Sequence, residues 1–316
     1  MKVLSRNYRT QLAAISITAG IFASGFANSV SATTIQDFDA LGGTSYTVAN
    51  YPAPNARPGP GVEGPDAFSS GQYLNLLSGG LFTRTQNSIG FDVSDSGAYN
   101  HITADFDFRI TCSGSRNGFR GGGCADGFSF LLLDTAVHGL SGAPKPTQAE
   151  FGVLSLAGQL AFNFSTFGAN SNKFSMLANN SWVPGAVPTN STVPFDLATG
   201  LNGIEGAFHH AYIDLFLGTT PTVTVNLTDG NTGGIYTPFS NFALPGSFFG
   251  TTEKRIGFVA RCGDACAEYD IDNINVRFQD PGQAGSVPEP ATIALFGLGL
   301  AGLRFRKKKV AKTITT

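Results

Sequence analysis

A row of acidic residues near the end of the chain is the first candidate for chemistry. The segment CAEYDIDNINVRF, residues 266–278, places Glu268, Asp270 and Asp272 at every second position. Successive side chains of a β-strand point to opposite faces, so these three carboxylates share one face of a predicted strand. Adjacent carboxylates repel one another unless a cation binds them, they share a proton, or water screens them.

Three interpretations of this row stay open. A water-facing strand surface is favoured, and a calcium site is the second interpretation, because hard cations take carboxylate oxygens. The third is a glycosidase pair, since the row resembles the Glu-x-Asp-x-Glu motif of laminarinase-type glucanases. The third acidic position here is Asp272 and no second Glu follows it. We therefore expect no catalytic activity, and calcium is the only cofactor that we consider.

Four cysteines form two local pairs. Cys112 and Cys124 flank the segment SGSRNGFRGGG, and Cys262 and Cys266 flank GDA. Three pairings of four cysteines exist, and we favour the two local ones, each of which would close one loop between strands. Zinc is disfavoured because the two pairs are separated and none of the four histidines lies beside them. The His209-His210 pair is predicted to lie in a surface turn.

The motif Ala-Asp-Gly opens a strongly apolar segment, CADGFSFLLLD, residues 124–134. A second apolar segment, AFNFSTFGAN, residues 161–170, follows downstream. In order and spacing these segments resemble the L-type (legume) lectin family, across much of residues 35–278. The resemblance implies a concanavalin A-like jelly roll that binds carbohydrate. It carries over Asp126 and Gly127 of the motif and Asn170 of the later loop as sugar-contacting residues. For Asp126 the alternative is a turn residue that caps a hairpin ahead of Gly127.

The chain departs from that family where the family holds its metals. Asn163 and Ser165 stand at the positions of the metal-binding Glu and Asp, and the following GANSNKF contains no carboxylate. The paired metal site of the family is therefore expected to be absent or weakened. In the family that site supports a cis peptide bond before the motif's Asp, so we expect a trans bond between Ala125 and Asp126, or a rearranged loop.

Alternation by twos predicts the elements that must position these residues. In ITADFDFRI, residues 102–110, apolar and polar side chains alternate, and TVTVNLT and AYIDLFLG repeat the pattern. Many such strands, separated by Gly, Pro, Asn and Ser, predict an all-β protein with two antiparallel sheets. The 27 phenylalanines are expected to fill the space between them. The apolar phase shifts after Ile271, which predicts a β-bulge near Asp272 and Asn273.

The N-terminus has the pattern of a secretory signal peptide. Lys2, Arg6 and Arg9 precede an apolar stretch, and small residues suited to signal peptidase follow at 30–32. We therefore predict a signal peptide over residues 1–32 and an exported domain over residues 33–280.

The C-terminus has three parts in a fixed order. Val287, Pro288, Glu289 and Pro290 end a linker over residues 281–290. A short apolar helix, residues 291–303, and a basic cytoplasmic tail, residues 304–316, follow. Thirteen helical residues reach about 20 Å, short of a bilayer core of about 30 Å. The arrangement resembles the PEP-CTERM sorting signal, which implies cleavage by an exosortase after transient anchoring in the inner membrane. A plain single-pass anchor is the alternative.

The charge distribution limits the partners. All 22 acidic residues but only 11 of the 20 basic residues lie between positions 33 and 290, which leaves that part with a net charge of −11. Nucleic acid is therefore not expected as a partner. We expect a surface or matrix protein that binds extracellular polysaccharide without catalysis. The alternatives are a purely structural or adhesive matrix protein and a glycoside hydrolase.

Overall fold

The computed structural model describes most of the predicted exported domain. The described residues are 32–39, 43–51, 60–78, 80–81, 85–94, 97, 99–112, 124–144, 157–167, 172–179, 181–187, 192–201, 203–245, 253–263 and 265–279. They belong to one compact unit, Ser31–Gly282. The predicted signal peptide up to residue 31, the linker, the apolar helix and the basic tail lie outside them.

The described elements are almost all strands. They are β1 Ala32–Gln36, β2 Tyr46–Tyr51, β3 Gly61–Glu63, β4 Tyr73–Leu77, β5 Gly80–Leu81, β6 Thr85–Phe91, β7 His101–Cys112, β8 Gly127–Asp134, α2 Thr135–His138, β9 Gln159–Ser165, β10 Lys173–Ala178, β11 Ser181–Trp182, β12 His209–Phe216, β13 Thr222–Thr228, β14 Ile235–Ala243, β15 Lys254–Cys262 and β16 Ala265–Gln279.

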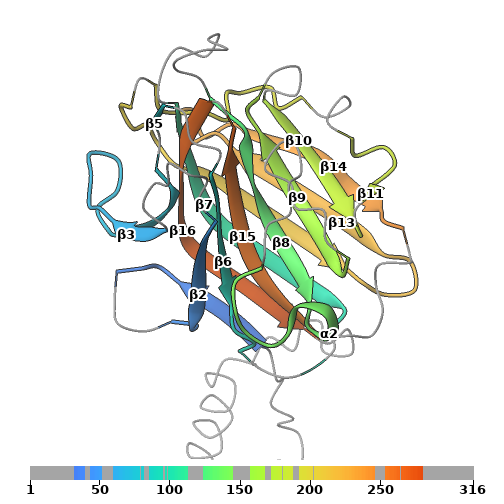
Figure 1. The fold of residues 1–316 in the computed structure, drawn as a ribbon. Helices are drawn as coiled ribbons and strands as arrows, with labels where there is room; N and C mark the ends of the chain where they lie inside the picture. Colours follow the sequence, from blue (N-terminus) through green and yellow to red (C-terminus); the bar gives the residue numbers. More distant parts are fainter. Residues whose placement is uncertain are drawn as a thin grey trace, which may run out of the picture. The chain divides into compact units, whose positions relative to one another are not determined.

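These strands form two layers (Figure 1). Among the described residues, a nine-stranded sheet has the order β14-β13-β12-β7-β16-β4-β3, with β1 and β5 also paired to β16. A seven-stranded sheet has the order β11-β10-β9-β8-β15-β6-β2. The pairs are antiparallel, as in β7 with β16 and β8 with β15. The predicted two-sheet antiparallel sandwich is confirmed.

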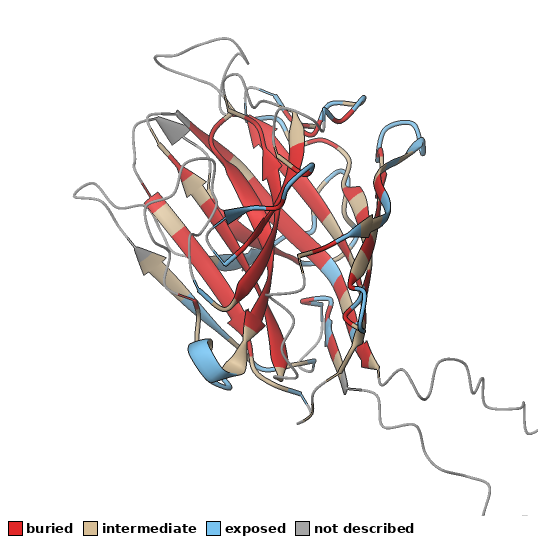
Figure 2. Cartoon of the chain, turned by 90° about the vertical axis from the view of Figure 1, so that its right-hand side faces the viewer, coloured by how far each residue is buried: buried red, intermediate tan, exposed pale blue. Residues whose placement is uncertain are grey.

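Phenylalanines from both sheets fill the space between the layers, as predicted. Phe106 of β7 lies 5.1 Å from Phe258 of β15, measured between ring centroids. Phe108, also on β7, lies 4.7 Å from Phe164 of β9, whose ring stacks at 4.5 Å on Phe128. All five rings are fully buried, and Figure 2 shows buried residues along both layers. This contiguous aromatic core fixes which face of each strand points outward.

Strand β16 changes register where the apolar phase of the sequence shifts. Its pairing with β7 is interrupted between Asp272 and Asn275, and Asn273 has a φ of 50°. The predicted bulge is therefore confirmed. Its effect is local: Tyr269 and Ile271 before the bulge and Ile274 after it are all buried in the core.

Candidate functional site

Asp126 lies where an end of one sheet meets the other. Its backbone N–H donates to the carbonyl of Arg261 on β15 at 2.9 Å, and its carbonyl accepts from Thr166 at 3.0 Å. The preceding carbonyl, of Ala125, accepts from the N–H of Ala267 on β16 at 3.1 Å. The Ala125–Asp126 peptide bond is cis, so the expected trans bond is wrong. Hydrogen bonds to both sheets surround this bond and do not depend on the family's metal ligands.

The carboxylate of Asp126 is oriented by neighbouring strands. It is 6 % exposed, and its Oδ2 lies 3.4 Å from Nε of Arg261. Gly263 approaches it so closely that an added Cβ would lie 3.4 Å from both carboxylate oxygens. Behind it, burial raises the pKa of the Tyr269 hydroxyl, and the charge of Asp126 adds to that rise. Asp126 therefore has a nearly buried carboxylate that is held beside Arg261 and Gly263.

The other two predicted sugar-contacting residues have different outcomes. Gly127 follows Asp126 as the first residue of β8 and pairs with Ser165 of β9 and Arg261 of β15. Asn170 lies outside the described residues, so its role stays a prediction.

Of the two positions that resemble the family's metal ligands, Asn163 lies in a neutral hydrogen-bonded chain, whereas Ser165 Oγ is buried without a hydrogen-bond partner among the described residues. Asn163 of β9 is fully buried, and its Oδ1 accepts from Ser129 Oγ of β8 at 2.7 Å. Its Nδ2 donates to Ser175 Oγ of β10 at 3.5 Å. Side-chain amides and hydroxyls thus satisfy one another across three strands where carboxylates would hold a cation.

Both local disulfides are present. Cys112, the last residue of β7, bonds Cys124 just before the Ala-Asp-Gly motif. Cys262 of β15 bonds Cys266 of β16 across a tight turn. The favoured cysteine pairing is confirmed, and both bonds fix segments next to Asp126.

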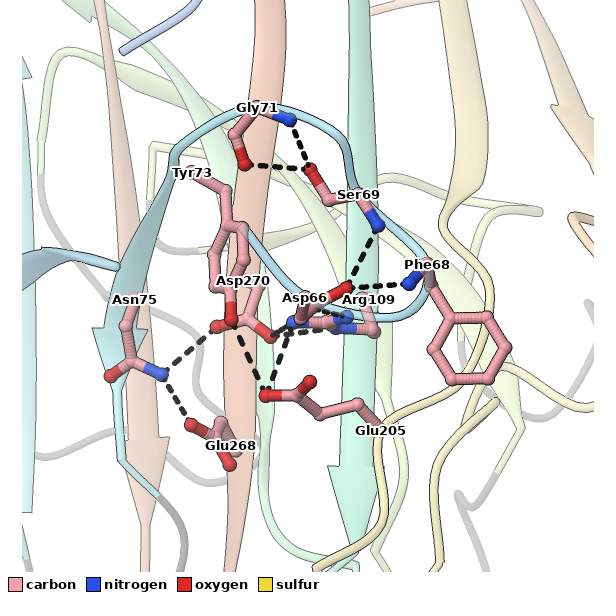
Figure 3. Close-up of polar contacts among 10 residues, drawn as sticks. All are labelled: Asp66, Phe68, Ser69, Gly71, Tyr73, Asn75, Arg109, Glu205, Glu268 and Asp270. Carbon is pink, nitrogen blue, oxygen red and sulfur yellow. Dashed lines mark hydrogen bonds and ion pairs between the residues drawn. The ribbon is translucent and has the colours of Figure 1, made fainter. Parts of the chain in front are cut away.

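The acidic row lies on the outer face of the nine-stranded sheet, opposite Tyr269 and Ile271, as the alternation predicted. It does not face water, however: Asp270 is fully buried and Asp272 is 7 % exposed. The favoured water-facing interpretation is therefore wrong for these two residues. For Asp270 the reason is a loop between β3 and β4, residues 64–72, whose Asp66 lies beside Arg109 over the sheet (Figure 3).

The centre of this region is Arg109 of β7, which is fully buried on the outer face. Its Nε donates to Oδ2 of Asp270 at 2.8 Å, and its Nη1 donates to Oδ2 of Asp66 at 2.7 Å. Its Nη2 lies 3.5 Å from Oε1 of Glu205. Aromatic rings cover the guanidinium: Tyr73 at 4.7 Å and Phe208 at 4.6 Å. We call this the Arg109 cluster and define it as Arg109, Asp66, Tyr73, Asn75, Glu205, Phe208, Glu268 and Asp270.

Glu268 joins the cluster through an amide. Asn75 Nδ2 donates to Oε1 of Glu268 at 2.7 Å and to Oδ1 of Asp270 at 2.9 Å. The two carboxylates are thus bridged by one neutral donor, while Arg109 neutralises Asp270. No group of three or more His, Cys, Asp or Glu side chains that could hold a metal occurs within the described part of the chain.

Burial and neighbouring charges shift the pKa values of the acids in the Arg109 cluster in different directions. Although burial opposes it, the N–H of Phe68 and the Arg109 guanidinium lower the pKa of Asp66 to about 2. Burial raises the pKa of Glu205, with Arg109 opposing. Burial, Glu63 and Glu205 raise the pKa of Glu268. Burial lowers the pKa of the Arg109 guanidinium, but the charge and hydrogen bond of Asp270, the hydrogen bond to Asp66 and the charge of Glu205 together outweigh burial and raise that pKa, so Arg109 stays charged.

A second polar cluster on the same sheet joins three strands. His210 of β12 is bonded through Nδ1 to Oδ1 of Asp107 on β7 at 2.8 Å, and its Nε2 lies 3.5 Å from Asp105. Asn273, in the bulge of β16, donates to the other Asp107 oxygen at 2.8 Å. His209 and His210 begin β12, so the predicted surface turn is wrong. The alternating pattern of neighbouring residues would have included this pair in the strand.

Sequence reasoning missed the Arg109 cluster because its members are far apart in the chain. The one signal was Arg109 itself, a cation at an outward position of the segment ITADFDFRI. Nothing in the sequence places Asp66 or Glu205 beside it.

Among the described residues, no helix has the length and apolar character needed to cross a membrane.

The chain was compared with protein families and with curated proteins. The model of the PEP-CTERM protein-sorting motif matches residues 286–309. No curated protein matches the sequence.

Among the solved structures similar to this chain are lectin-like proteins. Arcelin-5, a lectin-like defense protein from Phaseolus vulgaris, is 14 % identical, with a TM-score of 0.45, covering 74 % of this chain and 99 % of that one. Lectin UEA-II in complex with galactose is 11 % identical, with a TM-score of 0.47, covering 79 % and 98 %. The VIP36 exoplasmic/lumenal domain with Ca²⁺ and mannose is 14 % identical, with a TM-score of 0.47, covering 78 % and 89 %. The chain thus carries a PEP-CTERM protein-sorting motif, which indicates export, and its two-sheet sandwich has legume-type lectins among its structural neighbours.

Proposed function

We propose that the exported domain binds extracellular polysaccharide, without catalysis, at the end of the sandwich where Asp126 lies. The observation that carries this proposal is the fixed carboxylate of Asp126, oriented by Arg261 and by backbone bonds to β15 and to Thr166. A preorganised acceptor binds a hydroxyl donor without an ordering cost. Gly127 and Asn170, which the family resemblance also implies, complete the proposed sugar contacts.

The sorting motif supports an extracellular location for this polysaccharide binding. Val287, Pro288, Glu289 and Pro290 lie within the matched segment 286–309. In our proposal signal peptidase removes residues 1–32, the apolar helix over residues 291–303 anchors the chain in the inner membrane for a time, and an exosortase cuts near Pro-Glu-Pro. The domain then resides at the cell surface or in the polysaccharide matrix.

Two alternatives compete with polysaccharide binding. A purely structural or adhesive protein would keep the sandwich and have no sugar affinity. A glycoside hydrolase would need two available carboxylates, and the raised pKa of Glu268 suits a general acid. Its neighbour Asp270, however, is bonded to Arg109 and Asn75 and is fully buried. Release of reducing ends from polysaccharide, abolished by Glu268→Gln, would favour the hydrolase.

A glycan array with the full chain tests the proposal. Asp126→Asn removes the charge with little change in volume, so we expect it to abolish sugar binding. Asp214→Asn is the matched control, because Asp214 is a partly exposed acid on the other sheet, paired with His101 at 2.7 Å. Equal binding by both variants would overturn the Asp126 site, and no binding by the unmodified protein would favour the structural alternative.

A further inference from the structure

The loop between β3 and β4 presents an aromatic ring to solvent. Phe68 is 53 % exposed, although most phenylalanines of the described strands are buried in the core. Isolated exposed apolar residues are common on protein surfaces and need no explanation by themselves. What distinguishes Phe68 is how much buried structure holds it in place.

A chain of hydrogen bonds fixes the backbone that carries the ring. Oδ1 of Asp66 accepts from the N–H of Phe68 at 2.7 Å and from the N–H of Ser69 at 2.8 Å. The N–H of Asp66 donates to the Ser69 carbonyl at 3.0 Å. Ser69 Oγ in turn donates to the Gly71 carbonyl at 2.9 Å. These hydrogen bonds close the loop on itself (Figure 3).

This loop is attached to the sheet through the buried guanidinium of Arg109. The other oxygen of Asp66 accepts from Arg109 at 2.7 Å, and Arg109 is held by Asp270 and by two aromatic rings. A ring fixed in this way loses little conformational freedom when a ligand packs on it.

A second fixed segment lies on the other side of the same guanidinium. Glu205, whose side chain is 28 % exposed, lies 3.5 Å from Arg109. It follows Ile204, which is 71 % exposed and forms a tight pair of backbone bonds with Leu201, at 2.9 and 3.0 Å. Because Asp66 and Glu205 both contact the guanidinium, the two loops meet at Arg109. Each loop carries a partly exposed carboxylate and, next to it in the chain or two residues on, an exposed apolar side chain.

We propose that Phe68, together with Glu205 of the second segment that contacts Arg109, is a second carbohydrate-contacting surface, specific for an uncharged glycan. A pyranose ring has an apolar face that packs on an aromatic ring and hydroxyls that donate to carboxylates, which matches both kinds of group present. Around Arg109, the acids Asp66, Glu205, Glu268 and Asp270 outnumber the single cation. A polyuronate would be repelled by that charge, whereas a neutral polysaccharide would not.

This surface extends the proposed function. It rests on that function in one respect, because it assigns the Phe68 surface and the Asp126 site to the same polysaccharide. It lies on the nine-stranded sheet, whereas Asp126 directly precedes β8 of the seven-stranded one. The two regions are linked at one end of the sandwich, because Ala267, beside Glu268, bonds the residue before Asp126. When one polysaccharide chain binds at both surfaces, the second binding event is intramolecular, so the overall affinity exceeds that of either surface alone.

Binding of the full chain to soluble neutral β-glucan, mannan and galactan, and to alginate as the polyuronate, tests this proposal. We expect Phe68→Ala to weaken binding to the neutral glycan about tenfold and Phe68→Tyr to restore it within about twofold. Phe216→Ala is the matched control, because Phe216 is 41 % exposed and lies on β12. Unchanged melting temperatures would show that the variants fold, as expected for exposed rings.

The outcomes separate this proposal from the Asp126 site. Loss of binding in Phe68→Ala but not in Phe216→Ala supports the second surface, even where Asp126→Asn binds normally. Equal affinity of Phe68→Ala and the unmodified protein overturns it, even where Asp126→Asn abolishes binding. Tighter binding to alginate than to every neutral glycan overturns the specificity, and no binding to any of the four overturns both proposals.

Discussion

Arg109 of β7 and Asp270 of β16 form a completely buried ion pair on the outer face of the nine-stranded sheet, with Nε and Nη2 both 2.8 Å from the same carboxylate oxygen. Removal of Arg109 would leave the buried Asp270 without a cation, and removal of Asp270 would leave the buried guanidinium with only the more exposed acids Asp66 and Glu205, so each change is expected to destabilise the fold.

We expect Asp270→Asn to lower the free energy of unfolding by about 3–5 kcal/mol, the cost of breaking a buried pair. The double variant Arg109→Met with Asp270→Leu should recover part of that loss, because it removes both charges. Denaturant unfolding with disulfides intact measures the change. Asp214→Asn, which breaks a partly exposed pair with His101, should cost less than about 1 kcal/mol. A loss for Asp270→Asn no larger than that for Asp214→Asn would contradict the prediction.

The raised pKa of Asp272 should lower the free energy of unfolding as the pH rises. Burial and the nearby charge of Asp107 raise the pKa of Asp272 to about 7, whereas an unfolded Asp has a pKa of about 3.9. The folded state therefore holds the proton more tightly, and its stability is full below about pH 4 and falls through about pH 7. We expect Asp272→Asn to be more stable than the unmodified protein at pH 8, with a smaller difference at pH 5. Unfolding midpoints at the two pH values measure this, and a gap that does not widen with pH would refute it.

The hydrogen bond between His210 and Asp107 should raise the pKa of His210. Asp107 raises the pKa of His210, with burial opposing. Stability from this pair is therefore present below the unfolded His pKa of about 6.5 and is lost as the pH rises through the folded value. In Asp107→Asn we expect the pKa of His210 to fall, as measured by NMR titration of the ring protons. His209, whose pKa burial lowers to about 4, serves as the internal reference. An unchanged His210 titration would show that Asp107 is not its main partner.

Calcium should leave the melting temperature unchanged. Arg109 and Asn75 occupy oxygens of Asp270, so the row Glu268, Asp270 and Asp272 has lost its middle ligand. A cation at about one hundred times its Kd would add about 2.7 kcal/mol to the free energy of unfolding. Calorimetric melting with calcium and with a chelator measures this. A calcium-dependent rise that Asp272→Asn removes would instead establish a site at the acidic row.

The strand pattern could be predicted because the required information is local. Alternation in ITADFDFRI fixes that Phe106 and Phe108 point inward, and the same rule fixes the outward direction of Asp270. The cysteine pairs were predictable for a related reason, since each lies across one short loop. The sorting motif is a contiguous segment, and the chain carries it between residues 286 and 309.

The surroundings of the outward residues could not be predicted in this way. Asp270 and Arg109 are 161 positions apart, and Asp66 is 43 positions before Arg109. Alternation shows only which face a side chain takes and is silent on what covers that face. For this reason the acidic row was expected to be exposed to solvent. In the structure, loop 64–72 places Asp66 against Arg109, which is bonded to Asp270 of the row.

The sequence by itself determined two β layers, their aromatic filling, their disulfides and the sorting signal, because each depends on neighbours within a few residues. Only the tertiary structure decided that Arg109 is buried, that Asp270 is neutralised and that Phe68 is held out to solvent. Those outcomes depend on contacts between distant segments, which form only when the sheet brings β4, β7 and β16 side by side.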